Sequence, residues 1–507
     1  MVIRILFCFW IFIPSFLFSQ ALVYFTDKPL LDSNRQTSSY LSERANERRV
    51  KQSIAYDVYD LPVYKGYLDS LRTLGVEVKQ ASRWLNAVEV DFKNVEVSVV
   101  EQLNFVESTI EYRSSTAFKK ASTSKFAELA ESSEVLAQVD QLAMSEFHDK
   151  SLEGDGVMIA IIDAGFYHYD QLAPFQQIRD NNGIVEVFDF VDGDSSVSED
   201  HFHGMHVFGA IAASGDNYKG MAEQASFVLY RTENVNEETP LEEFYWTLAA
   251  ERADSIGVDI INASLGYTTF DNSLFDYEKE DMDGETGIIN KAANKASDKG
   301  ILVVASAGNE GGNSWGTLIK PADSPKVLTV GAVNSKGAYA SFSSIGPTAD
   351  GRIKPDVVAQ GASTALIATN GGVMYGDGTS YSAPLISGFA ACVWQKFPDL
   401  TNYELKDLII RSANRYSIPN NQYGYGLPNG FRIWQSETGL EEDLLHTKVV
   451  VVNGVYHFSE DIVAVHSLDG RIVRFEEGVR SYDFLNLKNG LYVILLSNNE
   501  KLKVVVE

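Results

Sequence analysis

Cysteine is almost absent from this chain of 507 residues, which contains only Cys8 and Cys392. Cys8 lies in an N-terminal stretch that we expect to be removed, so the remaining chain cannot form an internal disulfide. Its stability must come from a hydrophobic core, and 45% of the residues are hydrophobic. We expect Cys392 to be a small buried apolar residue rather than a reactive thiol.

Basic residues are few in comparison with acidic ones. The chain has 42 Lys and Arg against 69 Asp and Glu, a formal net charge of −27. This excess of negative charge argues against a nucleic-acid partner, because binding to phosphates depends on positive charge. The net charge says little about catalytic chemistry, because excess acidic residues of this kind usually lie on the solvated surface.

Long hydrophobic runs are missing after the first twenty residues. Residues 1–20 contain one early charge, Arg4, and then an apolar run through Phe18. The run is short for a transmembrane helix and polar sequence follows at once, so it predicts a secretory signal peptide. We expect no membrane-spanning segment in the mature protein.

Three regions flank or link a longer central one. Residues 21–116 mix helix-like and strand-like segments and predict a small α+β unit. Residues 117–149 have weaker apolar patterning and predict a linker that leads into the central region. Residues 437–507 contain short alternating strands separated by Asn-Gly and Asp-Gly pairs, which predicts a small β-sandwich.

The central region, residues 150–436, alternates short apolar runs with longer helical stretches. This pattern predicts an α/β fold with a parallel sheet covered by helices on both faces, whose site lies at the carboxyl ends of the strands. The predicted strands are Val157 to Ile162, Phe227 to Tyr230, Asp259 to Asn262, Ile301 to Ala305 and Val327 to Val330. The predicted helices are Leu241 to Ile256, Gly287 to Lys299 and Tyr381 to Phe397.

Two polar side chains in this region stand where a site is expected. Asp163 follows a predicted strand, although an aspartate there is often only a turn or helix-cap residue. His203 opens a helix rich in Gly and Ala and can face a cleft. His206, three residues later, leaves a metal site open, but a third ligand at a familiar spacing is missing.

Two further motifs carry Asn309 and Ser380. Asn309 follows the predicted strand 301–305, where its amide can donate to a developing oxyanion or simply stabilise a glycine-rich turn. Ser380 stands after Gly378 at the start of a predicted helix, where it is either an N-cap or a nucleophile whose oxyanion faces the helix N-terminus.

Together the four motifs resemble the subtilisin-like serine proteases, the subtilases, in their order Asp, His, Asn and Ser. The stretches that carry the resemblance are Ile161-Ile162-Asp163-Ala164-Gly165, His203-Gly204-Met205-His206, Ser306-Ala307-Gly308-Asn309 and Gly378-Thr379-Ser380-Tyr381-Ser382-Ala383-Pro384. The resemblance implies that Ser380 is the nucleophile and His203 the general base. It also implies that Asp163 orients the imidazole and Asn309 is the oxyanion donor.

Three positions depart from the family pattern. Ala164 stands where Thr or Ser usually follows the aspartate, so a hydroxyl is missing there. Met205 replaces the usual Thr in the histidine motif, and Tyr381-Ser382 replaces the usual Met-Ala after the nucleophile. None of these changes removes a reacting group, so they bear on rate and pocket shape.

The resemblance also implies a substrate strand and a structural ion. Ser264, Leu265 and Gly266 match the segment that pairs with extended peptide and lines the primary specificity pocket, although a simple core strand is the alternative. Catalysis needs no cofactor, but structural calcium is common in the family. Candidate ligands, or else solvated loop residues, are Asp192, Asp194, Glu199 and Asp200, and separately Asp281 and Asp283.

The flanking regions resemble parts of exported bacterial subtilases. Residues 21–116 look like a propeptide that assists folding and blocks the cleft; an extra substrate-binding domain is the alternative. The tail, with Leu468-Asp469-Gly470-Arg471 and Leu487-Lys488-Asn489-Gly490, is similar to C-terminal sorting domains of the type IX secretion system of Bacteroidetes. A carbohydrate-binding or adhesion sandwich is its alternative.

The sequence thus predicts a secreted or cell-surface serine endopeptidase of a Gram-negative bacterium. Its expected partners are peptide or protein substrates, its own propeptide and, through residues 437–507, an export machinery. The main alternative is an inactive subtilase-like binding or adhesion protein. A lipase or esterase is a distant third, because the Gly-x-Ser-x-Gly motif is absent around Ser380.

Overall fold

The computed structural model describes most of the chain. The described residues are 20–29, 37–112, 126–127, 137–215 and 218–436, together with the tail segments 449–452, 455–467, 472–474, 479–483, 490–496 and 501–506. Residues 1–19 of the predicted signal peptide therefore lie outside the described residues, whereas Gln20 is the first residue of β1. Two compact units are present, one formed by residues 1–40 and 56–116 and the other by residues 41–55 and 117–507.

The first unit is a four-stranded antiparallel sheet with two helices, as the sequence predicted for a small α+β unit. The strand order is β2-β3-β1-β4. Alternate residues of β1 and β3, such as Val23, Val88 and Val90, are fully buried in its core. Its elements are β1 (Gln20–Phe25), η1 (Thr37–Tyr40), η2 (Val58–Asp60), α2 (Lys65–Thr73), β2 (Glu77–Ser82), β3 (Ala87–Asp91), α3 (Val97–Glu101) and β4 (Val106–Tyr112).

Residues 41–55 leave this unit in the connection between β1 and α2. They carry the helix α1 (Glu43–Lys51), and the chain returns to the first unit at Tyr56. The stretch predicted as one block, residues 21–116, is therefore shared between the two units, because α1 packs with the second.

The second unit is built on a seven-stranded parallel sheet, as the alternating pattern predicted. Its strand order is β14-β13-β12-β11-β6-β10-β7. Six of the seven strands are buried along their whole length or nearly so, which is why they read as continuous apolar runs. The strands are β6 (Met158–Asp163), β7 (Ile184–Asp189), β10 (Ser226–Arg231), β11 (Ile260–Ala263), β12 (Leu302–Ser306), β13 (Leu328–Val333) and β14 (Val357–Gln360).

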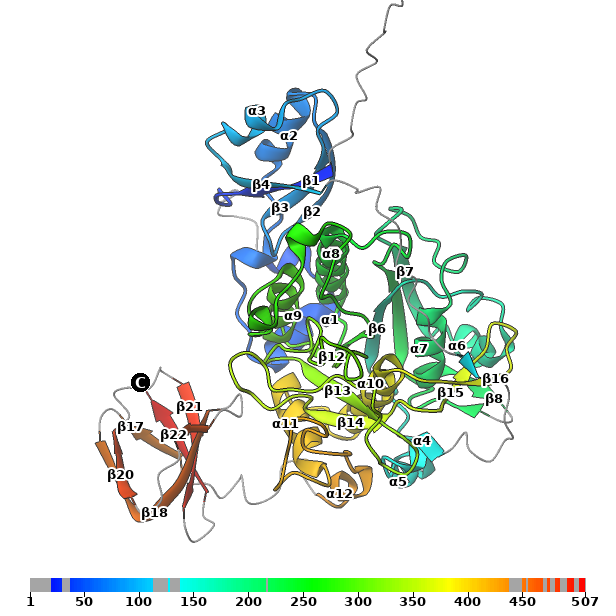
Figure 1. Ribbon diagram of the computed structural model, residues 1–507, viewed down its shortest axis with the longest axis vertical. Coiled ribbons are helices and arrows are strands. Elements are labelled where there is room, and N and C mark those ends of the chain that lie inside the picture. The colour runs from blue at the N-terminus through cyan, green and yellow to red at the C-terminus, as the bar shows by residue number, and fades with distance from the viewer. Residues whose placement is uncertain are drawn as a thin grey trace, which may run out of the picture. The chain divides into compact units, whose positions relative to one another are not determined.

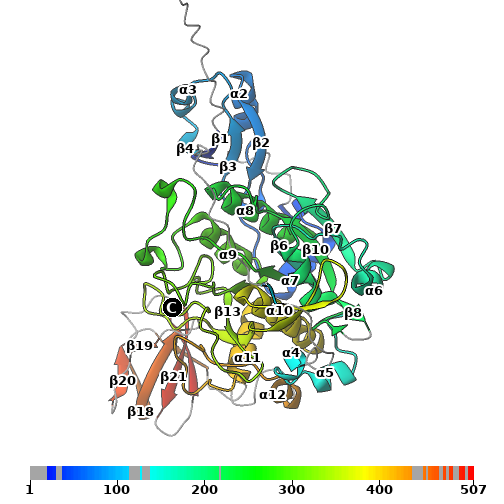
Figure 2. The same cartoon turned by 45° about the vertical axis from the view of Figure 1, so that its right-hand side comes forward.

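Helices cover the two faces of this sheet (Figures 1 and 2). Helices α8 and α9 contact each other on one face, and α7 and α10 contact each other on the other. Alternate strand residues such as Ile159 and Ile161 share one hydrophobic cluster with Phe208 of α7 and Ile386 of α10. The helices of the unit are α4 (Ala137–Asp140), α5 (Ser145–Asp149), α6 (Gln176–Asp180), α7 (His203–Ala212), α8 (Pro240–Ile256), α9 (Ile288–Asp298), α10 (Thr379–Lys396), α11 (Asn402–Ser412) and α12 (Gly430–Gln435), with the short turns η3 (Ala173–Phe175), η4 (Ser273–Phe275) and η5 (Lys279–Asp281).

Two strands of the sheet were not predicted from the sequence. Strand β7 lies at one edge of the sheet and is half exposed, so its pattern lacks a continuous apolar run. Strand β14 has only four residues and follows Pro355 closely, which makes its sequence resemble a loop. Pairing with β10 and with β13 places these two strands at the opposite edges.

A smaller sheet precedes the helix α10. Strands β15 (Thr364–Ile367) and β16 (Val373–Gly376) form a hairpin, and β5 (Phe126–Ala127) adds a third strand to β16. Part of the predicted linker 117–149 therefore pairs with the segment that leads to Ser380. A second hairpin consists of β8 (Ser214–Gly215) and β9 (Tyr218–Lys219).

The described segments of the tail form one six-stranded sheet, where the sequence predicted a sandwich. The order is β17-β22-β21-β18-β19, and β20 pairs with β18. Strand β17 pairs in parallel with β22, and Asn453-Gly454 lies outside the described residues. The strands are β17 (Val449–Val452), β18 (Val455–Ser467), β19 (Ile472–Arg474), β20 (Val479–Asp483), β21 (Gly490–Leu496) and β22 (Lys501–Val506).

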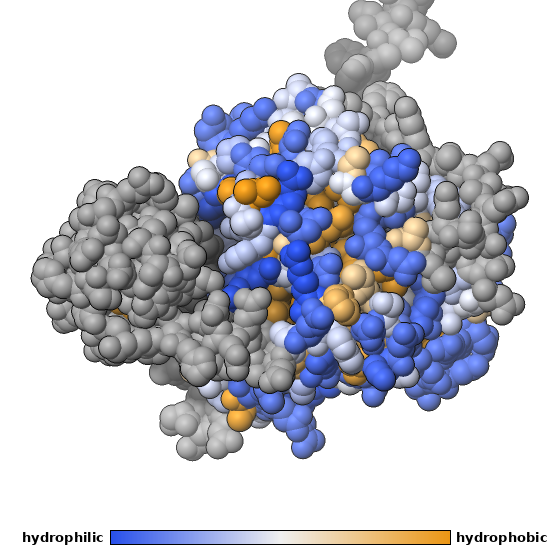
Figure 3. Space-filling model, turned by 90° about the horizontal axis from the view of Figure 1, so that it is seen from below, coloured by the Kyte–Doolittle hydropathy of each residue, from blue (hydrophilic) through white to orange (hydrophobic). Residues whose placement is uncertain are grey.

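Hydrophilic residues cover most of the described surface seen in Figure 3, with smaller apolar patches between them. In the described part of the chain, every helix is too short or too polar to cross a membrane.

Phe227 of β10 tests the packing between the sheet and α7. Its ring is fully buried and lies edge-on to Phe208, with 5.0 Å between the ring centroids. Phe227→Ala leaves a cavity and should lower the free energy of unfolding by about 3–5 kcal/mol. The measurement is urea unfolding in a Ser380→Ala background. Val185→Ala is the control, because Val185 is 51% exposed and should cost about 0.5 kcal/mol or less.

Candidate active site

An aspartate and a histidine form the centre of the site. Asp163 is the last residue of β6 and is 1% exposed, and His203 is the first residue of α7. His203 Nδ1 lies 2.7 Å from Asp163 Oδ1, so a proton on Nδ1 is donated to the carboxylate. The same oxygen accepts a hydrogen bond from the backbone N–H of Ala164 at 2.8 Å. The pair therefore fixes the orientation of the imidazole and directs its other nitrogen away from Asp163.

Glycine at position 204 allows this close approach. A Cβ on Gly204 would stand 2.5 Å from the carbonyl oxygen of Gly165 and 2.9 Å from Asp163 Cβ. Both distances are too short for any other residue unless α7 moves away from the end of β6. The glycine after His203 is thus part of the geometry that joins the histidine to the aspartate.

The second carboxylate oxygen of Asp163 is buried and has no hydrogen-bond partner among the described residues. The side chain of Ala164 offers no hydroxyl to it. This is the physical result of the departure at position 164, because a Ser or Thr there carries a donor.

A glutamate that sequence reasoning missed lies near this pair. Glu233 follows β10 by two residues, and its Oε1 accepts hydrogen bonds from the Tyr267 hydroxyl at 2.5 Å and from the Thr232 hydroxyl at 3.0 Å. Burial, together with the charge of Asp163, raises the pKa of Glu233 to about 7, although those hydrogen bonds oppose the shift. The feature of the sequence that could have identified Glu233 is its position just beyond the carboxyl end of a predicted parallel strand.

The pKa of His203 is raised above its ordinary value. Burial lowers this pKa, but the charge and hydrogen bond of Asp163 and the charge of Glu233 more than offset burial. His206 behaves in the opposite way, since burial and the two neighbouring histidines lower its pKa to about 3. In the described part of the chain, neither His203 nor His206 belongs to a cluster of metal-ligating side chains, so the metal alternative lacks support.

Ser380 is the second residue of α10 and lies beside the histidine's helix. The rings of His203 and Tyr381, the residue after Ser380, are 5.9 Å apart. The Ser380 hydroxyl donates to the carbonyl of Ser264 at 3.1 Å, and the Ser264 hydroxyl donates back to the carbonyl of Ser380 at 2.8 Å. Among the described residues, Ser380 makes no hydrogen bond to His203.

Asn309 joins this edge of the sheet from the loop after β12. Its Oδ1 accepts hydrogen bonds from the backbone N–H of Thr379 at 2.9 Å and from the Thr379 hydroxyl at 3.0 Å. The oxygen is thereby fixed one residue before Ser380. The side-chain nitrogen has no hydrogen-bond partner among the described residues, and the residue is exposed. The amide is thus available to donate to a ligand next to Ser380.

The predicted substrate strand follows β11. Ser264 is already engaged with Ser380, and its hydroxyl also accepts from Asn262 Nδ2 at 3.0 Å. Gly266 passes so close to Lys320 that a Cβ would stand 2.5 Å from the Lys320 carbonyl oxygen. Leu265 lies between them and is half-buried. The structure therefore places Ser264, the first residue of the predicted segment 264–266, directly beside Ser380.

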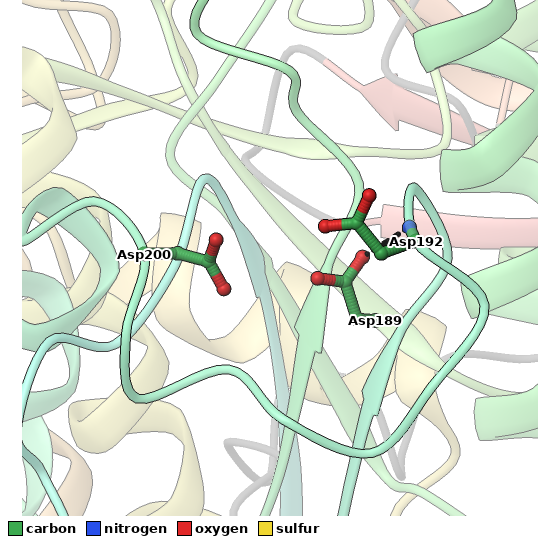
Figure 4. Close-up of side chains that lie close together, drawn as sticks. All are labelled: Asp189, Asp192 and Asp200. Carbon is green, nitrogen blue, oxygen red and sulfur yellow. Dashed lines mark hydrogen bonds between the residues drawn. The ribbon is translucent and has the colours of Figure 1, made fainter.

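The acidic residues proposed as calcium ligands are engaged with protein groups. Asp192 and Asp200 lie near Asp189 (Figure 4), which the sequence analysis had not included. Arg231 Nη1 lies among all three carboxylates, 2.5 Å from Asp189, 2.7 Å from Asp192 and 3.3 Å from Asp200. One guanidinium offsets only part of the charge of three carboxylates, so the cluster of Asp189, Asp192 and Asp200 stays a candidate calcium site.

The other candidate ligands serve local backbone structure. Asp194 accepts from the backbone N–H of Ser196 at 2.8 Å, and Asp281 accepts from that of Glu278 at 2.8 Å. Asp283 accepts from the backbone N–H groups of Glu285 and Thr286. Glu199 is exposed and lies outside the carboxylate cluster.

Comparison with known proteins identifies the family. The model of the subtilase family, Peptidase_S8, matches residues 154–426. The chain belongs to the subtilase family of serine peptidases. A second model, the peptidase S8 propeptide domain of Bacteroidota, matches residues 20–128. The predicted family and its propeptide are therefore confirmed.

Two curated subtilisins agree with this membership. Subtilisin from Bacillus pumilus is 33% identical over 297 residues, which cover 57% of this chain and 95% of the relative. Subtilisin NAT from Bacillus subtilis subsp. natto is also 33% identical over 297 residues, covering 57% of this chain and 69% of the relative. A solved cold-adapted subtilisin-like serine proteinase is 25% identical, with a TM-score of 0.43, over 55% of this chain and 88% of that chain.

Gly204→Ala tests whether the close approach of α7 to β6 holds the subtilase site together. The added Cβ must displace the Gly165 carbonyl or the start of α7, which lengthens the contact between His203 and Asp163. We expect kcat/KM for a peptide substrate to fall by roughly 100-fold, because small misplacements of reacting groups cost this much. Gly215→Ala is the matched control, since a Cβ there meets no atom within 4 Å. Equal activity of both variants would contradict the argument.

Proposed function

We propose that this subtilase hydrolyses peptide bonds through an acyl-enzyme on Ser380. Ser380 Oγ attacks the scissile carbonyl while His203 takes its proton, and His203 later gives the proton to the leaving amine. Asp163 holds the imidazole and stabilises its charged form. The observation that carries the proposal is the 2.7 Å contact of His203 with the buried Asp163 at the edge where Ser380 also lies.

Stabilisation of the oxyanion falls to Asn309 and to the start of α10. The Asn309 oxygen is held by Thr379, which leaves the amide nitrogen to donate. The first N–H groups of an α-helix lack intrahelical partners and lie at its positive end, so the N-terminus of α10 adds to this stabilisation. A tetrahedral intermediate on Ser380 would thus meet donors from two sides.

Binding of an extended peptide would release the nucleophile. In the structure the Ser380 hydroxyl donates to the carbonyl of Ser264, which is the first residue of the proposed substrate strand. A substrate backbone N–H that pairs with this carbonyl competes for it, so the Ser380 hydroxyl turns toward His203. Substrate binding and activation are coupled in this way through Ser264. Leu265 and Gly266 would continue the pairing and line the specificity pocket.

The proposed maturation follows the order of the regions. Residues 1–20 act as a signal peptide and residues 21–116 as the inhibitory propeptide. Cleavage within residues 117–149 then frees the catalytic domain, residues 150–436. The match of residues 20–128 to a propeptide model of Bacteroidota supports export from a Gram-negative cell. We further propose residues 437–507 as a sorting domain of the type IX secretion system, based on their sequence motifs.

Labelling with a fluorophosphonate tests the nucleophile. We expect the matured wild-type protein to be modified at Ser380, with the modified peptide mapped by mass spectrometry, because only an activated serine reacts rapidly. Ser380→Ala should lose labelling and lower kcat by about 10⁶-fold, the scale known for subtilisin. Ser341→Ala, which changes an exposed serine away from these contacts, is the control and should label normally.

The alternative of an inactive binding protein makes the opposite prediction. Wild-type protein that is folded and free of residues 21 to about 120, yet unlabelled at Ser380, would exclude the proposed hydrolysis. The binding role would then be preferred.

The pH profile tests the influence of Glu233 on His203. A general base must be neutral, so kcat/KM should fall as the pH drops below the raised pKa of His203. Glu233→Gln removes a negative charge that raises this pKa, so the acid limb should move to lower pH. The difference should appear on the part of the acid limb near and above about pH 7, where Glu233 is charged in the wild type, and should vanish at higher pH, where His203 is neutral in both proteins. Glu237→Gln, an exposed change nearby, should leave the profile in place; a shift equal to that of Glu233→Gln would exclude a specific role.

A further inference from the structure

Part of the propeptide match packs as a component of the second unit. Residues 41–55 lie within the matched segment 20–128, yet they group with the catalytic residues and not with the sheet β2-β3-β1-β4. Helix α1 contacts α8 in this unit, and Figure 1 shows it in blue beside the green helices. Ser42 caps the N-terminus of this helix, and its Oγ accepts a hydrogen bond from the backbone N–H of Ala45 at 3.1 Å.

Arg44, Arg48 and Gln52 are spaced four residues apart. Their side chains line one side of α1 and its C-cap, because residues i and i+4 lie on the same helix face. They donate to carbonyls at the ends of α8 and α9. The last carbonyls of a helix lack intrahelical partners and carry its negative partial charge. The bonds join Arg44 Nε to Gly257 O (2.9 Å), Arg48 Nη2 to Asp254 O (3.1 Å), Arg48 Nε to Lys299 O (3.2 Å) and Gln52 Nε2 to Gly300 O (2.8 Å).

Buried ion pairs add to these hydrogen bonds between α1 and α8. Asp254 of α8 is fully buried, and Arg48 Nη2 lies 2.6 Å from its Oδ1. Arg49 Nη2 lies 2.8 Å and 2.9 Å from the two oxygens of the same carboxylate. Arg48 and Arg49 are only 5% and 1% exposed. Separation of α1 from α8 would leave the Asp254 carboxylate without these cations, which is costly for a buried charge.

Two glycines of the second unit allow its backbone to pack closely against the segment that contains α1. Gly257 ends α8 in the left-handed conformation, and a Cβ there would stand 2.7 Å from Arg44 Cγ and 2.8 Å from the backbone nitrogen of Ala45. Gly300, which follows α9, also has a positive φ, and a Cβ there would stand 2.8 Å from Ile54 Cδ1. Any larger residue at either place would push α1 away.

We propose that the C-terminal ends of α8 and α9 form a docking site for the segment 41–55, which anchors the propeptide to the catalytic unit after the chain between them is cut. The inference rests on the proposed function, because it supposes cleavage after residue 112. The chain leaves the first unit at Tyr40 and returns at Tyr56, so α1 is joined to that unit from both sides. While α1 is docked, the first unit stays at a high effective concentration near the enzyme. One cut would therefore not release the propeptide.

The test uses the full chain with Ser380→Ala, so that no step depends on its own hydrolysis. A recognition sequence for a site-specific protease is inserted within residues 113–125, the chain is cut there, and the fragments are separated by gel filtration. We expect the N-terminal fragment to elute with the catalytic fragment in equal amounts. In Arg48→Ala/Arg49→Ala the dissociation constant should rise by about 100-fold or more, because hydrogen bonds to charged groups are lost.

The matched control removes two basic side chains that lie outside the docking site. Lys65→Ala/Arg72→Ala changes residues of α2 whose side chains are 78% and 50% exposed, and it should leave co-elution intact. Co-elution that is equally tight in the Arg48/Arg49 variant, or a wild-type fragment that elutes alone, would overturn the proposal.

Hydrogen exchange supplies a second measurement in case the arginine variant does not fold. In the cut chain that carries only Ser380→Ala, backbone amides of α1 should exchange slowly, as expected for a docked helix. Exchange as fast as in a free peptide would overturn the proposal. Because an added protease makes the cut, failure of Ser380 to label would exclude the proposed hydrolysis while leaving this result valid.

Discussion

The contact between His203 and Asp163 depends on how closely α7 can approach the end of β6. Both residues stand at element boundaries, the last residue of a buried strand and the first of a helix. Only a glycine at position 204 fits between the helix and the Gly165 carbonyl. The orientation and charge of the imidazole follow from this steric condition, so a residue without a side chain is as necessary to the site as those that react.

The parallel sheet explains why the remaining groups converge. Strands β6, β10, β11 and β12 run in the same direction, and each has at or beyond its carboxyl end a polar residue that reaches the site. The helix α10 then brings Ser380 against Ser264, the residue after β11. Each group is held by a neighbour: Asp163 by Ala164, Asn309 by Thr379, and Ser380 by Ser264. Such a network of short contacts prearranges the site before substrate is present.

Arginine side chains in this protein pair directly with clustered or buried carboxylates. Arg231 lies among three aspartates near the site, and Arg48 and Arg49 share the buried Asp254 at the far ends of α8 and α9. In a chain with a net charge of −27, these few arginines occupy positions where unpaired carboxylates would be expensive.

Local patterns in the sequence determined the alternating α/β fold, the ends of α8, α9 and α10 to within two residues, and the four motifs that identify a subtilase. Continuous apolar runs and helical spacing are properties of neighbouring residues, so they can be read without a structure. Three features required the tertiary structure: the approach of Glu233 to His203, the arginine within the aspartate cluster, and the packing of residues 41–55 with α8 and α9. Each joins side chains that lie far apart in the chain, and only the fold decides which distant charges meet.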